Sequence, residues 1–270
     1  MKFLGIDFGW QSGASGLCCL SWENDCLQLC AKHSADTSRE EPAINSGMLR
    51  PDDRRESITD ILAWVDAVAP NPQSAIVAVD APTIITNATG MRTADRLTHK
   101  YFGRYHAGAY PASLRSRFAD RTVALGRSLG DRGFAHAPTI AKRTPGRYQI
   151  EVYPHPAIVN LFGLNQILKY KKGPLAHRQL ELAKLHQYIG EILPRLEPPL
   201  APDTIGKIPQ VQTKLTLKTF KAIEDQLDAL LCAYIGAYWW YWGEERNLVL
   251  GNGAEGYIVI PAARAEKLDQ

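Results

Sequence analysis

The sequence predicts a protein of the mixed α/β class. Short apolar runs typical of strands alternate with amphipathic patterns of helical period, and apolar residues occupy 45% of the 270 positions. Charged residues make up 22%, an ordinary share for a chain that folds around a buried core. We therefore expect one domain over residues 1–270, with a mainly helical basic insertion at residues 83–146.

The N-terminal stretch is typical of a three-stranded antiparallel meander. Residues 3–9 form an apolar run that contains an Asp-x-Gly sequence starting at Asp7, and residues 17–22 and 26–31 form two further runs. The Glu-Asn-Asp sequence between the second and third runs favours a tight turn. We expect the first strand to carry Asp7 at its carboxyl end.

A helix and two parallel strands are expected in the middle of the chain. Residues 51–68 have apolar residues at helical spacing, and the proline at their start suits a first helical turn. Residues 74–80 form a continuous apolar run, which is typical of a strand buried on both faces. Residues 147–153 alternate and stop at a proline, so they predict another strand, with Glu151 near its end.

The rest of the chain predicts helices followed by a hairpin. Residues 174–193 and 219–241 have helical patterns, and four prolines within residues 197–209 indicate a loop. Two apolar runs at residues 248–251 and 256–261 indicate a terminal hairpin. This order of elements predicts a mixed sheet, in which an antiparallel meander continues into parallel strands and helices flank both.

Carboxylates close three of the predicted strands, at Asp7, Asp80 and Glu151. Because chemistry in open α/β sheets lies beyond the carboxyl ends of the strands, we expect these acids to converge. Clustered carboxylates repel one another, and a hard divalent cation such as Mg²⁺ or Mn²⁺ removes that conflict. A lone acid at a strand end also serves as a turn former or a helix cap, so it is the set of three that indicates a metal site.

The last predicted helix adds two more carboxylates. Asp225 and Asp228 are three positions apart and therefore share one face of the helix. Asp228 interrupts an apolar face, and a buried carboxylate without a partner is costly, so a metal ion is the expected partner. Glu224, in contrast, is expected to interact with the positive end of the helix dipole.

Taken in order, these motifs resemble the ribonuclease-H-like superfamily. They are most similar to the family catalogued as domain of unknown function 429, the predicted ribonuclease-H-like nucleases. The matching stretches span nearly the whole chain: GIDFG at 5–9, AVDAP at 78–82, EVYPHP at 151–156, DQLDALL at 225–231 and GNGAEGYIVIP at 251–261. The family often has an acidic residue and a tryptophan where this chain has Asn252 and Tyr257.

The resemblance implies a ribonuclease-H-like fold, with metal ligation by Asp7, Asp80 and Asp228 and with Glu151 and Asp225 close by. On this basis Asp7, Asp80, Glu151 and Asp228 are the predicted catalytic residues. All five carboxylates are predicted ligands of two Mg²⁺ or Mn²⁺ ions, one activating water and the other stabilising the leaving oxygen. The predicted function is that of a metal-dependent nuclease.

The segment from residue 92 to residue 147 is strongly basic. It holds twelve Lys or Arg against three Asp, a charge of +9 that leaves −6 for the rest of a chain whose net charge is +3. Arginine binds phosphate oxygens bidentately, so this segment predicts contact with a nucleic acid backbone, whereas the alternative is a solvated helix face. The predicted contacts are Arg92, Arg96, Lys100, Arg104, Arg115, Arg117, Lys142 and Arg143.

Other features predict smaller roles. His155 follows a strand end and is a candidate for proton transfer. The aromatic end of the last helix, with Trp239, Trp240 and Trp242, predicts core packing or a homodimer contact. The five cysteines have no zinc-type spacing, and neither a secretory leader nor a membrane span is recognisable, so we expect a cytoplasmic protein without membrane contact.

Two alternative functions remain open at this point. An actin-like ATPase or small-molecule kinase shares the same ancestral fold, and the turn after Asp7 is able to hold ATP phosphates through backbone amides. A non-catalytic nucleic-acid-binding protein with the same fold is the other alternative. Nucleotide hydrolysis without polymer cleavage favours the first, and binding without cleavage favours the second.

Overall fold

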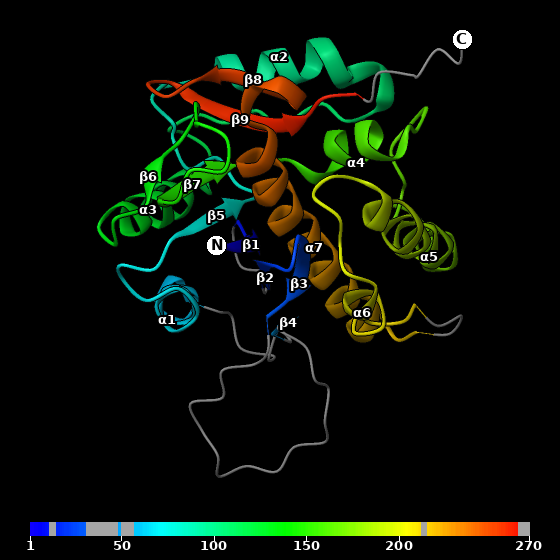
Figure 1. Ribbon diagram of the computed structural model, residues 1–270. Helices are drawn as coiled ribbons and strands as arrows, with labels where there is room; N and C mark the ends of the chain where they lie inside the picture. The colour runs from blue at the N-terminus through cyan, green and yellow to red at the C-terminus, as the bar shows by residue number, and fades with distance from the viewer. Residues whose placement is uncertain (11–14, 31–47, 50–56, 212–214, 264–270) are drawn as a thin grey trace, which may run out of the picture.

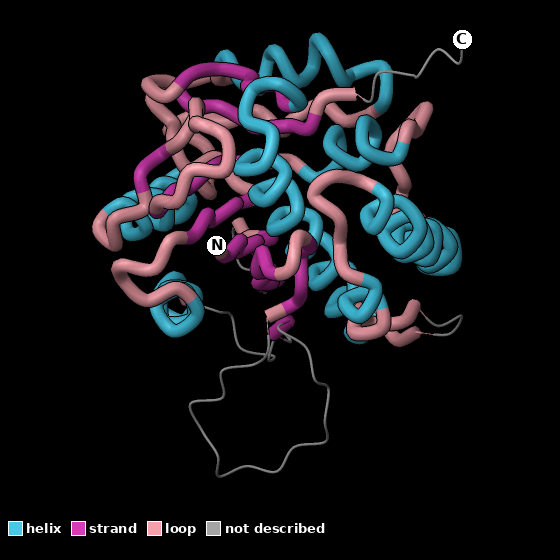
Figure 2. The backbone as a smooth tube through the Cα atoms, in the orientation of Figure 1, coloured by secondary structure: helices cyan, strands magenta, loops and turns pink. Residues whose placement is uncertain are grey.

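A computed structural model of the chain describes residues 1–270 except 11–14, 31–47, 50–56, 212–214 and 264–270. Its centre is a mixed sheet of seven strands, of which six run in the order β3-β2-β1-β5-β7-β6 while β4 pairs with β2. Helices lie on both sides of this sheet, and a separate hairpin lies beside α2 (Figure 1, Figure 2). The predicted mixed α/β class is confirmed.

The antiparallel half of the sheet is the predicted meander. β1 (Lys2–Asp7) pairs with β2 (Gly16–Glu23), and β2 pairs with β3 (Cys26–Leu29). The short β4 (Met48–Leu49) pairs with the start of β2. The third strand ends earlier than the predicted boundary, and residue 31 lies outside the described residues.

The parallel half continues from β1. β5 (Ala75–Val79) lies parallel to β1, and β7 (Arg147–Glu151) lies parallel to β5. β6 (Ala135–His136), which the sequence did not predict, extends the sheet beyond β7. The register aligns the carboxyl ends of β1, β5 and β7 at one edge of the sheet, as their sequences predicted.

Helices cover both faces of the sheet. α7 (Leu217–Trp242) crosses one face together with α4 (Pro154–Phe162) and α5 (Leu175–Ile192). α1 (Ile58–Val68) and α3 (Ala119–Gly130) cover the opposite face. The protein therefore has a helix–sheet–helix arrangement, with α7 running diagonally through the middle (Figure 1).

The strands are apolar at successive positions because both of their faces are buried. Phe3 and Ile76 pack toward α7, whereas their neighbours Leu4 and Val77 pack toward α1 and α3. Successive side chains of a strand point to opposite faces, so a continuous apolar run fills both layers of the core. This is the physical basis of the central strand predicted from residues 74–80.

The basic insertion at residues 83–146 contributes to two parts of the fold. Its α2 (Thr93–Phe102), followed by the 3₁₀ helix η1 (Gly103–Tyr105), packs on the hairpin of β8 (Asn247–Asn252) and β9 (Gly256–Pro261). Its second long helix, α3, packs on the sheet instead. The terminal hairpin agrees with the sequence prediction.

Two predicted boundaries need correction. Residues 197–209, predicted as a loop, contain the short helix α6 (Pro202–Ile205), because a proline also suits the first turn of a helix. The Thr204 hydroxyl of α6 accepts a hydrogen bond from the Leu29 amide at the end of β3 (3.0 Å). The helix predicted from residue 51 is described from Ile58, where the Ser57 side chain caps it, and residues 51–56 lie outside the described part.

Two 3₁₀ helices complete the set of elements. η2 (Leu193–Arg195) follows α5 directly, and η3 (Gly243–Arg246) follows α7 directly. The predicted helices at residues 174–193 and 219–241 therefore correspond closely to α5 and α7. Within the described chain, no helix combines the length and the apolar character that a bilayer crossing requires.

The aromatic end of α7 lies mostly in the core of its own chain. Trp239 is fully buried, and its indole donates a hydrogen bond to the Ala137 carbonyl (3.1 Å). Trp240 is nearly buried and donates to the Thr144 carbonyl (3.2 Å). Core packing therefore explains these two residues, and the homodimer contact stays a prediction that depends on the half-exposed Trp242.

The contact between β1 and α7 yields a stability prediction. A Cβ atom added at Gly5 would overlap the backbone of Ala229 and Ala233 on α7. We expect Gly5→Ala to lower the free energy of unfolding by at least ~2 kcal/mol, because the helix must move off the sheet. Urea denaturation measures this change. Gly103→Ala is the control, since an added Cβ there meets nothing within 4 Å, and equal losses in both variants would contradict the prediction.

Candidate active site

Four aspartates converge where the carboxyl edge of the sheet meets α7, and we call them the aspartate cluster: Asp7, Asp80, Asp225 and Asp228. Asp7 ends β1, and Asp80 directly follows β5, where its backbone amide donates to the Ile6 carbonyl (2.9 Å). Asp225 and Asp228 are buried on α7. The structure thus brings together four of the five carboxylates that the sequence predicted as ligands.

Two glycines allow α7 to bring its carboxylates this close. Added Cβ atoms at Gly5 and at Gly16 would overlap the α7 backbone, at Ala229 and at Asp225 respectively. Gly16 also lies opposite Asp7 in the β1–β2 register. The helix therefore rests directly on strand backbone, which places Asp225 beside the end of β1.

A lysine ammonium group lies inside the aspartate cluster. Lys171, from the segment between α4 and α5, has its Nζ 2.7 Å from Asp228 Oδ2 and 4.0 Å from Asp7 Oδ1. The neighbouring Tyr170 is fully buried, and its hydroxyl donates a hydrogen bond to Asp228 Oδ1 (2.8 Å). Both oxygens of Asp228 therefore have a partner from the same short segment.

A second lysine contacts the other aspartate of α7. Lys221 Nζ lies 2.6 Å from Asp225 Oδ1 and 2.7 Å from Glu224 Oε1. Glu224 also pairs with Arg178 from α5 (3.1 Å). Glu224 therefore takes part in ion pairs, rather than only in the predicted helix-dipole interaction.

The electrostatics of the cluster reflect burial among like charges. Burial is the main cause that raises the pKa of Asp80 well above its usual value. Burial, followed by the nearby Asp7 carboxylate, raises the pKa of Asp225 to about 8. Burial acts in the opposite direction on Lys171, but Asp228 and Asp7 outweigh it and raise the pKa of this ammonium, so it stays charged.

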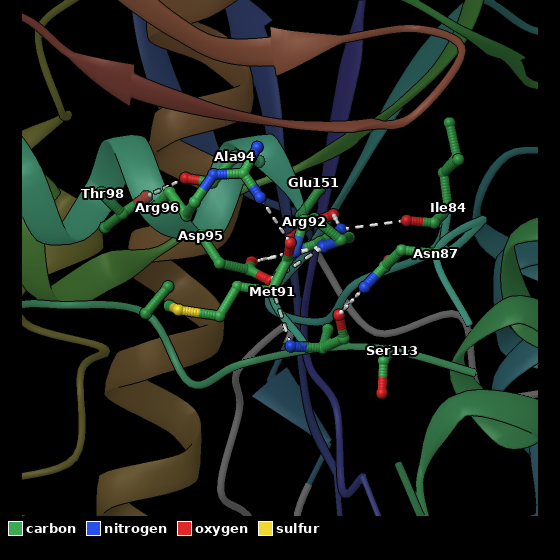
Figure 3. A network of polar contacts seen from close by, with 12 residues as sticks. Ile84, Asn87, Met91, Arg92, Ala94, Asp95, Arg96, Thr98, Ser113 and Glu151 are labelled. Carbon is green, nitrogen blue, oxygen red and sulfur yellow. Dashed lines mark hydrogen bonds and ion pairs between the residues drawn. The ribbon is translucent and has the colours of Figure 1, made fainter. Parts of the chain in front are cut away.

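Glu151 belongs to a second, closed ion cluster with Arg92 and Asp95, near enough to Asp80 for its charge to raise the pKa of that carboxyl. Both of its oxygens accept hydrogen bonds from the Arg92 guanidinium (2.7 and 2.6 Å), which also pairs with Asp95 (2.8 Å, Figure 3). Burial is the main cause that raises the pKa of Glu151 to about 7, although Arg92 opposes it. In this arrangement Glu151 does not present free oxygens to a metal, which differs from its predicted role.

Arg92 differs from its prediction in the same way. It is 3% exposed, and its guanidinium is held by Asp95, Glu151 and the carbonyl of Ile84 (3.0 Å, Figure 3). A planar guanidinium in such a fork stabilises buried carboxylates. Arg92, which the sequence predicted to bind nucleic acid, therefore stabilises the buried carboxylates of Asp95 and Glu151.

The other predicted nucleic acid contacts lie at the surface. All seven are exposed: Arg96, Lys100, Arg104, Arg115, Arg117, Lys142 and Arg143. Some have surface partners, such as Lys142 with Glu245 (2.5 Å) and Arg143 over the ring of Tyr241 (3.9 Å). None of the seven lines the cavity described next, so they do not arch directly over the cluster.

A cavity of about 810 Å³ opens beside the aspartate cluster. Asp7, Asp80 and Asp225 line it, and so do the aromatic side chains of Trp10 and Tyr110. Four lysines also reach it: Lys169, Lys171, Lys172 and Lys221. The cavity therefore combines carboxylates, ammonium groups and an aromatic wall.

His155 lines the same cavity. Burial, followed by the charge of Lys171, lowers the pKa of His155 to about 4, so the imidazole is neutral at pH 7. Its ring packs between Tyr153 and Tyr170, and its Nδ1 has no hydrogen-bond partner among the described residues. The structure thus places a neutral imidazole on the wall of the cavity, just beyond the end of β7, and its role in proton transfer stays a prediction.

Sequence reasoning missed the cationic half of the site. The signal was the Lys-Tyr-Lys-Lys run at residues 169–172, just before the glycine and proline that precede α5. This run is indistinguishable from a solvated loop until the fold brings it to α7. Lys221 was likewise not singled out, although it stands one helical turn before Asp225.

The cluster does not enclose a point ready for a metal ion. In the part of the chain that the structure describes, no three His, Cys, Asp or Glu side chains are arranged to hold one. Two buried carboxylate oxygens of the cluster have no hydrogen-bond partner in that part: Asp228 Oδ2, which has the Lys171 ammonium 2.7 Å away, and Asp225 Oδ2, for which no ion-pair partner is found there either. Buried carboxylate oxygens rarely lack a partner, so Asp225 Oδ2 marks the side of the cluster that is incomplete.

Fold and site together define an α/β protein with an acidic cluster, countered by lysines, at the carboxyl edge of a mixed sheet. The chain belongs to the family described as Protein of unknown function (DUF429), whose family model matches residues 5–254. This match confirms the family that the ordered motifs resembled. Searches of curated proteins and of solved structures gave no match.

The closed ion cluster yields a prediction about stability and pH. We expect Arg92→Met to lower the free energy of unfolding by ~3–5 kcal/mol at pH 8, because two buried carboxylates lose their shared partner. Without Arg92, the pKa of Glu151 rises further above 7, so the carboxyl is neutral at pH 5 and the loss is smaller there. Urea denaturation at both pH values measures this difference.

The control for this experiment is Arg96→Met. Arg96 is exposed on the same helix, and its removal should change stability by no more than ~0.5 kcal/mol. A loss in Arg92→Met that is equal at pH 5 and pH 8 would contradict the role assigned to Glu151.

Proposed function

We propose that this protein is a metal-dependent nuclease that hydrolyses phosphodiester bonds at the aspartate cluster. One observation carries the proposal: Asp225 Oδ2 is buried without a hydrogen-bond partner in the described part, close enough to Asp7 to feel its charge. A buried, unsatisfied carboxylate beside a second carboxylate is the environment that a cation stabilises. The family match is consistent with this proposal and does not test it.

The donor set fits Mg²⁺ or Mn²⁺. The cluster consists of carboxylates alone, which are the hard oxygen ligands that these ions prefer. Asp7, Asp80 and Asp225, which line the cavity, would hold the ion. Asp228 stands beside them with Lys171 and Tyr170 on its oxygens, and Glu151 is left out because Arg92 occupies its oxygens. When bound, such an ion supplies Lewis-acid stabilisation of charge on a phosphoryl group.

The side chains of the cavity have complementary tasks. Lys169 and Lys172 line it without contacting the aspartate cluster, and their charges attract a phosphate. Lys171 and Lys221 reduce the negative field that would otherwise repel a polyanion. The neutral His155 lies on the cavity wall and is the candidate for proton transfer there.

Three further features support the proposal. The strand order, an antiparallel meander continued by parallel strands, supports the ribonuclease-H-like assignment that the resemblance implies. The exposed basic residues of the insertion support nucleic acid as the partner. Five free cysteines support a reducing, cytoplasmic location.

The test is cleavage of labelled single-stranded and duplex DNA and RNA with Mg²⁺ or Mn²⁺. We expect Asp7→Asn to lower the cleavage rate by ~100-fold or more, the scale on which loss of transition-state charge stabilisation acts. Binding of the same oligonucleotides should persist, because the lysines and the surface arginines are unchanged. Asp131→Asn, which removes an exposed carboxylate at the end of α3, is the matched control.

The outcomes separate the proposal from its alternatives. Hydrolysis of ATP without cleavage of any polymer would favour the ATPase or kinase. Binding without cleavage by the unaltered protein, with either metal, would favour a non-catalytic nucleic-acid-binding protein. Cleavage that survives in Asp7→Asn would refute the site.

A further inference from the structure

The position of Lys171 bears on how many metal ions the aspartate cluster takes. Its ammonium lies 2.7 Å from Asp228 Oδ2 and 4.0 Å from Asp7 Oδ1, so it stands between two predicted metal ligands. The Tyr170 hydroxyl binds the remaining oxygen of Asp228. The Asp228 side of the cluster is therefore already supplied with a cation and a hydrogen-bond donor.

The Asp225 side of the cluster has fewer partners for its carboxylate oxygens. Lys221 binds Asp225 Oδ1, whereas Asp225 Oδ2 has no hydrogen-bond partner among the described residues. Asp7 and Asp80 line the cavity on this side together with Asp225. The incomplete side is thus the one that faces incoming solutes.

The net charge of the aspartate cluster and its lysines indicates how many divalent cations can bind there. Carboxylates bind a metal ion in their ionised form, in which the four of the cluster carry four negative charges, and the ammonium groups of Lys171 and Lys221 return two positive ones. Glu224, which shares Lys221, is balanced separately by Arg178. Two negative charges remain, which one divalent cation neutralises, whereas two such ions would leave an excess positive charge in a buried site.

We propose that Lys171 takes the place of a second metal ion, so that the aspartate cluster binds one divalent cation and not two. This inference rests on the proposed function, because it concerns the same metal-binding site. It differs from the two-ion arrangement that the sequence predicted. Lys171 is then a positioning residue, whose charge holds Asp228 and Asp7 in place.

The test counts bound Mn²⁺ by electron paramagnetic resonance of the free ion. We expect the unaltered protein to bind one Mn²⁺ and Lys171→Met to bind two, because removal of the ammonium frees Asp228 Oδ2 and leaves three negative charges, which two ions exceed by only one. Lys171→Arg retains the charge and should bind one. Lys172→Met, in the same segment but without a carboxylate contact in the described structure, is the matched control and should also bind one. Circular dichroism checks that each variant is folded.

Each other outcome has a definite meaning. Two ions in the unaltered protein would overturn the inference and leave the proposed nuclease function standing. One ion in both the unaltered protein and Lys171→Met would overturn the assignment of Lys171 alone. No ion in any variant would overturn the inference and the metal-dependent function together.

A separate observation concerns two cysteines at the meander. Cys19 lies on β2 and Cys30 follows β3, and the Cys30 amide donates a hydrogen bond to the Cys19 carbonyl (2.9 Å). Their Sγ atoms are 2.7 Å apart, closer than non-bonded sulfur atoms normally approach. Opposed residues of antiparallel strands have Cα atoms ~4.5–5.5 Å apart, which lies within the range that a disulfide spans.

The two thiols differ in reactivity. The Cys30 side chain is half-buried and reachable from solvent, and its contact with Cys19 is the main cause that lowers its pKa. Cys19 is buried, and the hydrogen bond to Cys30 is the main cause that raises its pKa. Cys30 is thus the thiol that an oxidant reaches first, and Cys19 is the thiol that then attacks the oxidised Cys30.

We infer that Cys19 and Cys30 form a reversible disulfide when a hydroperoxide oxidises them. The Cys30 thiolate attacks the peroxide, which leaves as the alcohol or water, and Cys30 becomes a sulfenic acid. Cys19 then attacks this sulfur and releases water, so two thiols and one hydroperoxide give one disulfide, one alcohol and one water. A small dithiol such as dithiothreitol reverses the reaction by exchange.

The test is peptide mass spectrometry after treatment with hydrogen peroxide. We expect a peptide cross-linked between Cys19 and Cys30, the loss of two titratable thiols, and recovery of both with dithiothreitol. Cys26→Ser should retain the cross-link, because the Cys26 thiol is directed to the Glu23 carbonyl, whereas Cys30→Ser should abolish it. Conversion of Cys30 to a sulfinic acid without a cross-link, or a cross-link through Cys26, would overturn the inference.

Discussion

The contact between α7 and the backbone of β1 and β2 is the constraint on which the site depends. Because Gly5 and Gly16 have no side chains, the helix lies directly on the sheet and brings Asp225 and Asp228 to the end of β1. This close approach buries like charges together, which is unfavourable in a medium of low dielectric constant. The ion pairs of Lys171 with Asp228 and of Lys221 with Asp225 offset that cost. The glycines that allow the close approach and the lysines that compensate its charge therefore depend on each other.

The protein solves the problem of buried carboxylates in two different ways. Around Arg92 the solution is complete, because the planar guanidinium satisfies Asp95 and Glu151 and connects α2 to β7. In the aspartate cluster it is incomplete, because point-like ammonium groups leave an oxygen of Asp225 without a partner. The Arg92 cluster, in which the carboxylates have partners, contributes to stability. The aspartate cluster, which has an oxygen without a partner and lies beside a cavity, is the one suited to bind a ligand.

The distribution of positive charge also differs between the surface and the cavity. The sequence places most of the excess in the insertion, and seven of its eight predicted contact residues are exposed. Of the positive charges that line the cavity, only Arg92 comes from the insertion, and Glu151 and Asp95 hold it; the lysines come from the segment before α5 and from the start of α7. An extended polyanion would therefore meet surface arginines at a distance from the cluster and lysines within the cavity.

By itself, the sequence determined the main strands, the two longest helices and the convergence of Asp7 and Asp80, because these follow from local periodicity and from the common edge of parallel strands. Only the tertiary structure decided what the carboxylates contact. Tyr170 lies 58 positions before Asp228, and Arg92 lies 59 before Glu151, so no local pattern links the partners. The same holds for the cation in the cluster, because a lysine in a loop becomes a counter-ion only when folding brings it to a buried carboxylate.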